Sequence, residues 1–348
     1  MGTSVIRWSC VRFTVAAAAG TALLIAAGPP VLAQTALSLS LEGRVEGPSA
    51  PYLLAQARGH FKAEGLDVTI EPANGGLESI TRVASGQFDL GVADINAFIR
   101  YRDQNPAAPL KVVFVVHNRP GYAIVGRKSR GVSTPADLVD KRLGAPVAEN
   151  ASAVWPTFAK LNGIDPAKVR LVNVGIPVRD PMLVAGEIDA ATGTSFNSPI
   201  TLREKGVPGD DITTMVMGRF GLALYGAAII VNAKVLEQQP DAVRAFLRGL
   251  LAGLKETVND PPAAIPVVMR HMAGGGHAEG ELERLKVAIR DTIVTRAVRE
   301  HGIGDIDQAR FDTGLDQLAV SYNFKNRPKL ADVFDPSFMP PAEERRIN

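Results

Sequence analysis

The residues in this sequence that are best suited to chemistry are polar groups placed directly after short apolar runs. Asn74-Gly75-Gly76 follows the run from Leu66 to Ile70, and Asp94 follows the run from Leu90 to Ala93. Glycines before a helix can present backbone N–H groups to an anion, so Gly75 and Gly76 are candidate ligand contacts, unless the turn only requires a positive φ. Asp94 is either a ligand contact or the N-cap of the next helix.

A second set of candidates has the same placement further along the chain. Asn150 and Ser152 follow the apolar run from Leu143 to Val147, and either could cap the next helix or bind a ligand. Trp155, one turn into that helix, is a platform for a ligand ring or a core residue. Arg179 could hold a carboxylate, sulfonate or phosphate through its planar guanidinium, or pair locally with Asp180 or Glu149.

Three further loop residues complete the predicted ligand-binding site: Ser49, Asn197 and Tyr225. The site mixes acidic groups, Asp94 and Glu149, with one clear base, Arg179. This mixture favours a zwitterion or a substituted heteroaromatic ring over a simple anion, and the aromatic side chains nearby could stack on such a ring.

No catalytic motif accompanies these binding residues. The sequence has no G-x-S-x-G, H-E-x-x-H or P-loop pattern, and its five His are scattered. Its one Cys, Cys10, lies in residues 1–33, so residues 34–348 can support neither thiolate chemistry nor a disulfide. We therefore predict a binding protein and not an enzyme, with no metal site and no cofactor.

Alternating strands and helices must position the binding residues. Strands and helices joined by short glycine turns predict an α/β fold with mainly parallel strands and helices on the sheet faces. In such sheets, ligands bind beyond the carboxyl ends of the strands, where these candidates lie. The chain from 240 onward is mostly helical by its apolar periodicity.

Two regions of the chain resemble each other. FKAEGLD and SGQFD in the first region correspond to FAKLNGID and AGEID in the second, at an offset of about 100 residues. We therefore predict two similar αβ lobes in place of one long sheet. Lobe 1 is expected to comprise 34–127 and, after the chain returns, 226–348; lobe 2 is expected to comprise 128–225.

Residues 1–33 have the pattern of a secretory signal peptide. Arg7 and Arg12 precede an apolar run from Phe13 to Ala27, and Val31-Leu32-Ala33 provides a small-residue cleavage site. A transmembrane anchor is the alternative, but the run is short and Pro29-Pro30 follows it. The formal net charge is +2, which does not indicate binding to nucleic acid.

Two sequence pieces carry a family resemblance. They are G-x-F-x-x-x-G-L-D-V from Gly59 to Val68 and A-S-G-Q-x-D-x-G-V-A-D from Ala84 to Asp94. They resemble the solute-binding proteins of ABC-type uptake transporters, in the NMT1/THI5-like branch that includes nitrate-, sulfonate-, taurine- and thiamine-pyrimidine-binding proteins. The resemblance extends more weakly from about Leu37 to Lys325.

The resemblance implies a two-lobed periplasmic binding protein fold of type II, with a mixed sheet flanked by helices in each lobe and a hinge between the lobes. The cleft of such a fold captures a small organic solute. The expected ligand is a sulfonate, carboxylate, amino-acid-like zwitterion or pyrimidine. The expected partner is the membrane permease of an ABC transporter, and the expected form is a periplasmic monomer. A periplasmic ligand sensor is one alternative. A thiamine-pyrimidine biosynthesis enzyme is another, but the relatives that carry out that synthesis use a Cys-rich motif, which residues 34–348 lack.

Overall fold

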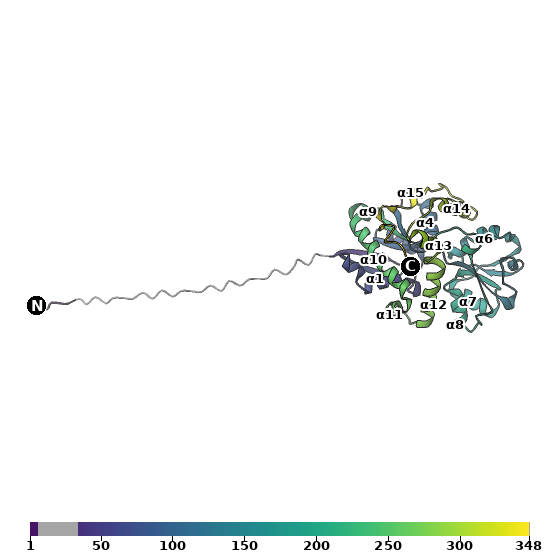
Figure 1. Cartoon of the computed structure of the whole chain (residues 1–348), viewed down its shortest axis with the longest axis horizontal. Helices are drawn as coiled ribbons and strands as arrows, with labels where there is room; N and C mark the ends of the chain where they lie inside the picture. The colour runs from purple at the N-terminus through teal and green to yellow at the C-terminus, as the bar shows by residue number, and fades with distance from the viewer. Residues whose placement is uncertain (6–33, 348) are drawn as a thin grey trace. The chain divides into compact units, whose positions relative to one another are not determined.

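The computed structural model describes residues 1–5 and 34–347. Residues 34–347 form two five-stranded mixed sheets flanked by helices (Figure 1), which confirms the predicted α/β fold. We call the first sheet and its helices lobe 1 and the second sheet and its helices lobe 2. The signal peptide predicted for residues 1–33 falls mostly on residues outside the described part of the chain.

The sheet of lobe 1 takes four strands from the start of the chain and one from much later. Its strands lie in the order β2 (Leu66–Glu71), β1 (Thr35–Ser40), β3 (Leu90–Asp94), β10 (Ala227–Asn232) and β4 (Leu110–Val115). β1 is parallel to β2 and β3, whereas β10 is antiparallel to β3 and β4. The carboxyl ends of β1 and β3 therefore open at the same edge of the sheet.

The sheet of lobe 2 has the same pattern with different strands. Its order is β7 (Arg170–Val172), β6 (Arg142–Gly144), β8 (Ala190–Thr194), β5 (Tyr122–Arg127) and β9 (Ile212–Val216). β6 is parallel to β7 and β8, and β5 is antiparallel to β8 and β9. The chain thus crosses between the lobes twice, through residues 116–121 and again through residues 217–226.

The position of β5 corrects one predicted boundary. We expected lobe 1 to continue to residue 127, but β5 pairs with β8 and β9 of lobe 2. The break comes earlier because Asn118-Arg119-Pro120-Gly121 interrupts the apolar sequence, and proline has no N–H for a sheet hydrogen bond.

Helices cover both sheets. Those of lobe 1 are α1 (Ala50–Ala57), α2 (His60–Ala63), α3 (Gly76–Ala84), α4 (Ile95–Gln104), α9 (Ala233–Gln238), α10 (Pro240–Asn259), α11 (Pro261–His271), α12 (Ala278–Ala288), α13 (Arg296–His301), α14 (Gln308–Leu318) and α15 (Leu330–Val333). Those of lobe 2 are α5 (Asn150–Ala153), α6 (Trp155–Leu161), α7 (Ile176–Ala185) and α8 (Ser198–Glu204). In Figure 1, α1 and α10 lie on one side of the molecule and α6, α7 and α8 on the other.

The internal similarity expected from the sequence is present at matching positions of the two sheets. Oδ2 of Asp89 accepts a hydrogen bond from the backbone N–H of Ser38 at 2.8 Å, which ties β3 to β1. Oδ2 of Asp189 accepts one from the N–H of Arg142 at 2.9 Å, which ties β8 to β6. Three residues before each Asp, a glycine with φ of 77° or 76° ends the preceding helix.

The core of lobe 1 lies on both faces of its sheet. Along β10, Ile229 and Val231 join the core that contains residues of α1 and α10, whereas Ala228 and Ile230 join the one that contains residues of α3 and α4. α1 and α10 pack closely at Gly253 because glycine has no Cβ. A Cβ at this position would clash with Cβ of Ala55, at a distance of 2.6 Å. This packing fixes α1, and with it the loop that precedes α1 at the rim of the cleft.

Within residues 1–5 and 34–347, no helix has both the length and the apolar character that crossing a membrane requires.

Candidate ligand-binding cleft

A cleft lies between the two lobes. Its inner part has a volume of about 280 Å³ and is lined by Glu42, Gly76, Asp94, His117, Pro120, Gly121, Tyr122, Ala148, Glu149, Asn150, Ala151, Ile176, Arg179, Thr194, Phe196, Asn197, Gly226 and Ala227. An outer part of about 180 Å³ shares Glu42, His117 and Phe196 with it and extends past Arg44, Glu46, Ser49 and Tyr52. Both lobes and both crossings therefore contribute to one continuous cleft.

Two carboxyl groups of lobe 1 lie at neighbouring strand ends in this cleft. Glu42 follows β1, and Asp94 is the last residue of β3. No hydrogen bond or ion pair joins the Glu42 carboxyl to another group in residues 34–347. Its burial, together with the charge of Asp94, raises the pKa of Glu42 to about 7. Glu42 is thus an acceptor open to a ligand.

Asp94 has its hydrogen bonds made within the protein. Its Oδ1 accepts from the N–H groups of Asn96 at 2.9 Å and Ala97 at 3.1 Å, so it caps α4. Its Oδ2 accepts from the hydroxyl of Tyr122 at 2.5 Å. Burial raises the pKa of Asp94, although these hydrogen bonds oppose the effect. Asp94 therefore combines two roles considered for it, since it caps a helix and lines the cleft.

Arg179 is held on the lobe 2 side by two carboxylates. It lies inside α7, and its side chain is 5 % exposed. Nε and Nη2 donate to the two oxygens of Asp180 at 2.8 and 3.1 Å, and Nη1 donates to Glu149 at 2.6 Å. Nη2 also donates to the Ser198 hydroxyl at 2.6 Å. The structure therefore has the local pairing that the sequence left open. Arg179 lines the cleft, but Asp180 and Glu149 neutralise its charge.

Two rings form a wall of the cleft. His117 and Phe196 meet edge to face, with ring centroids 6.3 Å apart. Burial lowers the pKa of His117 to about 4, so its imidazole is neutral at pH 7. Gly121 makes room for the Phe196 ring, because a Cβ there would lie 2.4 Å from Cε1 of that ring. The wall is therefore aromatic and uncharged.

The cleft brings together part of the predicted site. Its inner part contains Gly76, Asp94, Asn150, Arg179 and Asn197, and its outer part contains Ser49. Gly75 precedes Gly76 but does not line either part; its φ of 139° shows that the turn needs glycine. Ser152 lies behind the cleft wall, where its hydroxyl is 2.6 Å from that of Thr192.

Trp155 is a core residue and does not line the cleft. It is 1 % exposed, its ring lies 6.1 Å from that of Phe158, and neither part of the cleft includes it. Its position after a strand end suggested the cleft, but α6 turns this side chain inward. Its indole N–H has no hydrogen-bond partner in the described part of the chain.

We expect Trp155→Phe to lower the free energy of unfolding by about 1–3 kcal/mol, because a smaller ring leaves a void in a closed core. Denaturant unfolding would measure this loss. Since Trp8 lies in the predicted signal peptide, Trp155 would supply the indole fluorescence of the exported protein, and we expect that emission to be insensitive to ligand. A saturable ligand-dependent change in the emission would contradict the core assignment.

Tyr225 belongs to the hinge and does not line the cleft. The guanidinium of Arg310 lies over its ring, 3.9 Å from the centroid, and its hydroxyl accepts from the N–H of Asp307 at 2.9 Å. Arg310 also donates to the carbonyls of Ala223 and Leu224 in the second crossing, at 2.8 and 2.7 Å. It donates to Oδ1 and the carbonyl of Asn118 in the first, at 3.1 and 2.6 Å. One side chain of α14 thus binds both crossings.

Several cleft residues were not among the predicted site residues. Glu42, His117 and Tyr122 all line its inner part. Phe196 lines it too, as one of the aromatic side chains expected to stack on a ligand ring. Glu42 carried a detectable signal, since it lies just beyond the carboxyl end of the first strand and Asp94 lies at that of the third. His117, on the first crossing, and Tyr122, the first residue of β5, carried none, because the crossing itself became visible only in the structure.

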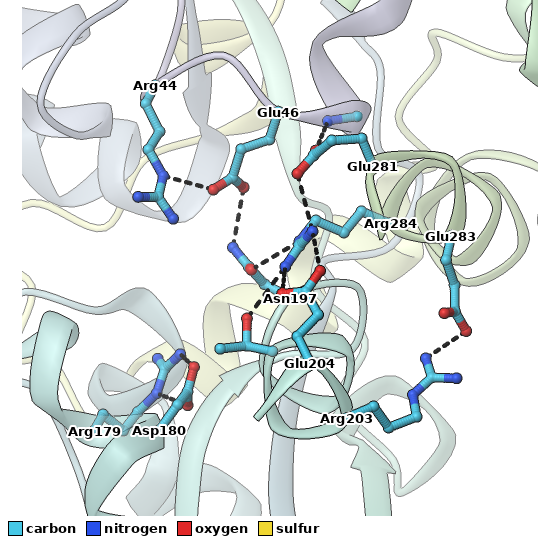
Figure 2. Close-up of polar contacts among 12 residues, drawn as sticks. Arg44, Glu46, Arg179, Asp180, Asn197, Arg203, Glu204, Glu281, Glu283 and Arg284 are labelled. Carbon is cyan, nitrogen blue, oxygen red and sulfur yellow. Dashed lines mark hydrogen bonds and ion pairs between the residues drawn. The ribbon is translucent and has the colours of Figure 1, made fainter. Parts of the chain in front are cut away.

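A group of polar contacts joins the lobes at the edge of the cleft. Figure 2 shows the guanidinium of Arg284, on α12, between the carboxyl groups of Glu281 and Glu204, with Asn197 beside it. Its Nη1 donates to Glu281 at 2.9 Å and its Nη2 donates to Glu204 of α8 at 2.7 Å. Asn197 donates to Glu46 at 3.0 Å. We call Glu46, Asn197, Glu204, Glu281 and Arg284 the interlobe latch.

Further contacts cross between the lobes outside the latch. Among them are the Tyr122–Asp94 hydrogen bond and one from the Thr157 hydroxyl of α6 to the Gln317 carbonyl of α14 at 2.7 Å. Arg100 of α4 donates to Oδ1 of Asn150 on α5 at 2.8 Å, so this predicted site residue bridges the lobes while it lines the cleft. Arg203 of α8 pairs with Glu283 of α12, and both side chains are about 40 % exposed. The structure therefore has its lobes in contact around the cleft.

The raised pKa of Glu42 predicts a pH-dependent stability for the ligand-free protein. Folding raises the pKa of the Glu42 carboxyl group to about 7. Such a group contributes to the stability of the folded protein at pH values below its pKa in the unfolded chain. This contribution is lost as the pH rises through the folded pKa. Glu42→Gln carries no charge and escapes that loss. We expect the Tm of the variant, relative to the original protein, to be about 2–4 °C higher at pH 8 than at pH 5, measured by calorimetry. A pH-independent difference would contradict the raised pKa.

Comparison with known proteins places the chain in a family. Residues 47–264 match the family described as NMT1/THI5 like. The riboflavin-binding protein RibY of Chloroflexus aurantiacus is 25 % identical over 78 % of this chain and 76 % of its own length. The 4-amino-5-hydroxymethyl-2-methylpyrimidine phosphate synthase of Schizosaccharomyces pombe is 24 % identical over 61 % of this chain, but the match spans only 62 % of that protein.

A solved structure extends the comparison to the fold. The periplasmic aliphatic sulphonate binding protein SsuA from Escherichia coli superposes with a TM-score of 0.69 at 12 % identity, over 87 % of this chain and 92 % of that one. At this identity the likeness concerns the fold alone, and it is the fold of two lobes around a cleft. The match over residues 47–264 and the architecture agree: this chain belongs to the NMT1/THI5-like family.

Proposed function

We propose that this protein captures a small organic solute outside the cytoplasm and delivers it to the membrane permease of an ABC transporter. The observation that carries the proposal is the cleft, which is bounded by both lobes and contains Glu42, a carboxyl group without a partner in residues 34–347. A polar group in a confined cleft gains most from a ligand that supplies its missing hydrogen bond.

The family and its members support the proposal. The name of RibY describes a binding protein, and SsuA, which shares the fold, is named for the sulphonate that it binds. The signal pattern in residues 1–33 supports a location in the periplasm. Two crossings between the lobes provide a hinge about which a cleft can close, as in other hinged binding proteins. We expect a monomer to perform this function.

Synthesis of a thiamine pyrimidine is the alternative raised by the synthase relative. Residues 34–348 contain no Cys, and the cleft carboxylates Asp94 and Glu149 are occupied by hydrogen bonds that hold the protein together. These features support binding over synthesis. A sensor that binds the same solute would need the same cleft, so sensing remains the second function compatible with this site.

Mass spectrometry of the exported, full-length protein tests the proposal. Under native conditions we expect one small solute bound per chain, released unchanged when the protein is denatured. Calorimetry with that solute should give one site. Conversion of the solute during incubation would overturn the binding function. So would a protein that neither carries a solute nor binds one from an extract of the cells that produce it.

A further inference from the structure

We propose that the cleft selects a ligand that presents N–H donors, such as an amine, an amidine or an amino-substituted nitrogen heterocycle, and that Glu42 accepts the hydrogen bond from it. This inference rests on the proposed function as a solute-binding protein and specifies the class of solute. It rejects simple anions, which earlier stood among the expected ligands.

The charges that line the cleft support this class. Four carboxyl groups, Glu42, Glu46, Asp94 and Glu149, line its two parts, against two guanidinium groups, Arg44 and Arg179. Arg179 is held by Glu149 and Asp180, whereas Arg44 pairs with Glu46 through Nε alone and its side chain is 84 % exposed, where water screens its charge. An anion that enters the cleft would meet an excess of negative charge, whereas a cation would be attracted.

Arg179 is the group that an anionic ligand would need, and the protein itself occupies it. Four of its five N–H donors point to Asp180, Glu149 and Ser198. A carboxylate or sulfonate could bind there only by displacing an internal carboxylate, which would then lie buried without a partner. Such a buried unpaired charge costs about 3–5 kcal/mol, so the exchange is unfavourable.

Unlike the guanidinium of Arg179, the carboxyl group of Glu42 is available to a ligand and can accept a hydrogen bond from it. Glu42 lines both the inner and the outer part of the cleft, so its carboxyl group lies where the two parts join. The groups around it from other elements are Asp94 of β3, Tyr52 of α1, and His117 of the first crossing, with Arg44 on its own loop. Asp94 repels its charge, and His117 is neutral at pH 7, so a cationic donor would supply the missing favourable interaction.

The walls define the rest of the ligand. Phe196 and His117 border both parts of the cleft beside Glu42, and neither carries charge at pH 7. A flat ring can pack on the Phe196 face while an attached N–H group reaches Glu42. The ligand class is therefore a compact ring or short apolar body with a nitrogen donor at one end.

A matched set of one-ring compounds tests the class directly. Benzamidine is a cationic donor, benzamide a neutral donor, and benzoate and benzenesulfonate are anions on the same ring. We expect ligand-observed NMR titrations into the millimolar range to show the highest affinity for benzamidine, a lower one for benzamide and the lowest for the two anions. Benzamidine should also bind less tightly as the pH falls below about 7, because protonation of Glu42 removes its charge.

Glu42→Gln identifies the acceptor. The variant should lower the affinity for benzamidine by at least about tenfold and the affinity for benzamide much less, because only the cation loses a charged partner. Glu71→Gln is the matched control: it removes the same charge from the exposed end of β2, outside the cleft, and should leave both affinities unchanged. Circular dichroism of each variant checks that the fold is retained.

Three results would overturn the inference: an anion that binds as tightly as benzamidine, a benzamidine affinity that Glu42→Gln leaves unchanged, or no binding by any of the four compounds. Each can be told apart from failure of the proposed function. If the exported protein carries an anionic solute in native mass spectrometry, solute binding stands and only the ligand class is wrong.

Discussion

Arg310→Ala is expected to lower the free energy of unfolding by about 3–4 kcal/mol. The side chain makes four hydrogen bonds to three residues, Asn118, Ala223 and Leu224, which lie in the two crossings between the lobes. A hydrogen bond of this kind contributes about 1 kcal/mol, and acceptors left buried without a donor cost at least as much. The stacking of its guanidinium on Tyr225 is lost as well. Urea unfolding of the purified protein would measure the change.

Two control variants separate this role from the loss of a charge. Arg310→Lys keeps the charge but not the planar guanidinium, so we expect it to lose nearly as much stability as Arg310→Ala. Arg299→Ala removes an exposed charge from α13 and should change stability by no more than about 0.5 kcal/mol. If Arg310→Ala behaved like Arg299→Ala, the side chain would not hold the crossings together.

The fold could be predicted from the sequence because its signals are local. Glycine turns after helices and short apolar runs recur at matched positions, and Asp89 and Asp189 occupy the same place in their sheets. The antiparallel β5 was placed in the wrong lobe, because the sequence marks a turn at Pro120-Gly121 but not which sheet the next strand joins.

The site could be predicted only where position along the chain determines position in space. A residue directly after a parallel strand reaches the cleft, as Asp94 does. The rotation of a helix is not fixed in this way, so Trp155, the first residue of α6, faces the core. Glu42 fits the strand-end rule, but it begins a Gly/Pro/Ser-rich stretch, whose composition predicts a loop and gives no sign of a binding group.

Contacts between distant segments could not be predicted at all. Arg310 contacts residues 86 to 192 positions away, and Arg284 contacts Glu204 across 80 positions. The amphipathic pattern of the C-terminal helices predicted that these helices would pack on a lobe, but an Arg on a polar face gives no sign of its partner. The charge excess of the cleft was likewise visible only after Arg179 was found to be paired.

Arg284→Ala is expected to open the lobes more than it unfolds the protein. In the closed arrangement its guanidinium pairs with Glu281, whose side chain is 5 % exposed, and with Glu204, whose side chain is 33 % exposed. Removing the partner of a buried carboxylate such as Glu281 costs about 3–5 kcal/mol. That cost applies only while the lobes stay together, because both carboxylates regain water when α8 and α12 separate. The ligand-free variant should therefore have a larger radius of gyration by small-angle X-ray scattering, with a smaller change in Tm than a core substitution produces.

Arg203→Ala provides the matched control, because Arg203 also pairs across the lobes, to Glu283, but both side chains are about 40 % exposed. An exposed pair contributes at most about 1 kcal/mol, so this variant should scatter like the original protein. Once a ligand is known, Arg284→Ala should also weaken its affinity, since part of the binding free energy would be used to close the lobes again. If both variants kept the original radius of gyration, the latch would not hold the closed form. The closure would then depend on the other interlobe contacts, such as Arg100–Asn150, Tyr122–Asp94 and Thr157–Gln317, and on the hinge contacts of Arg310.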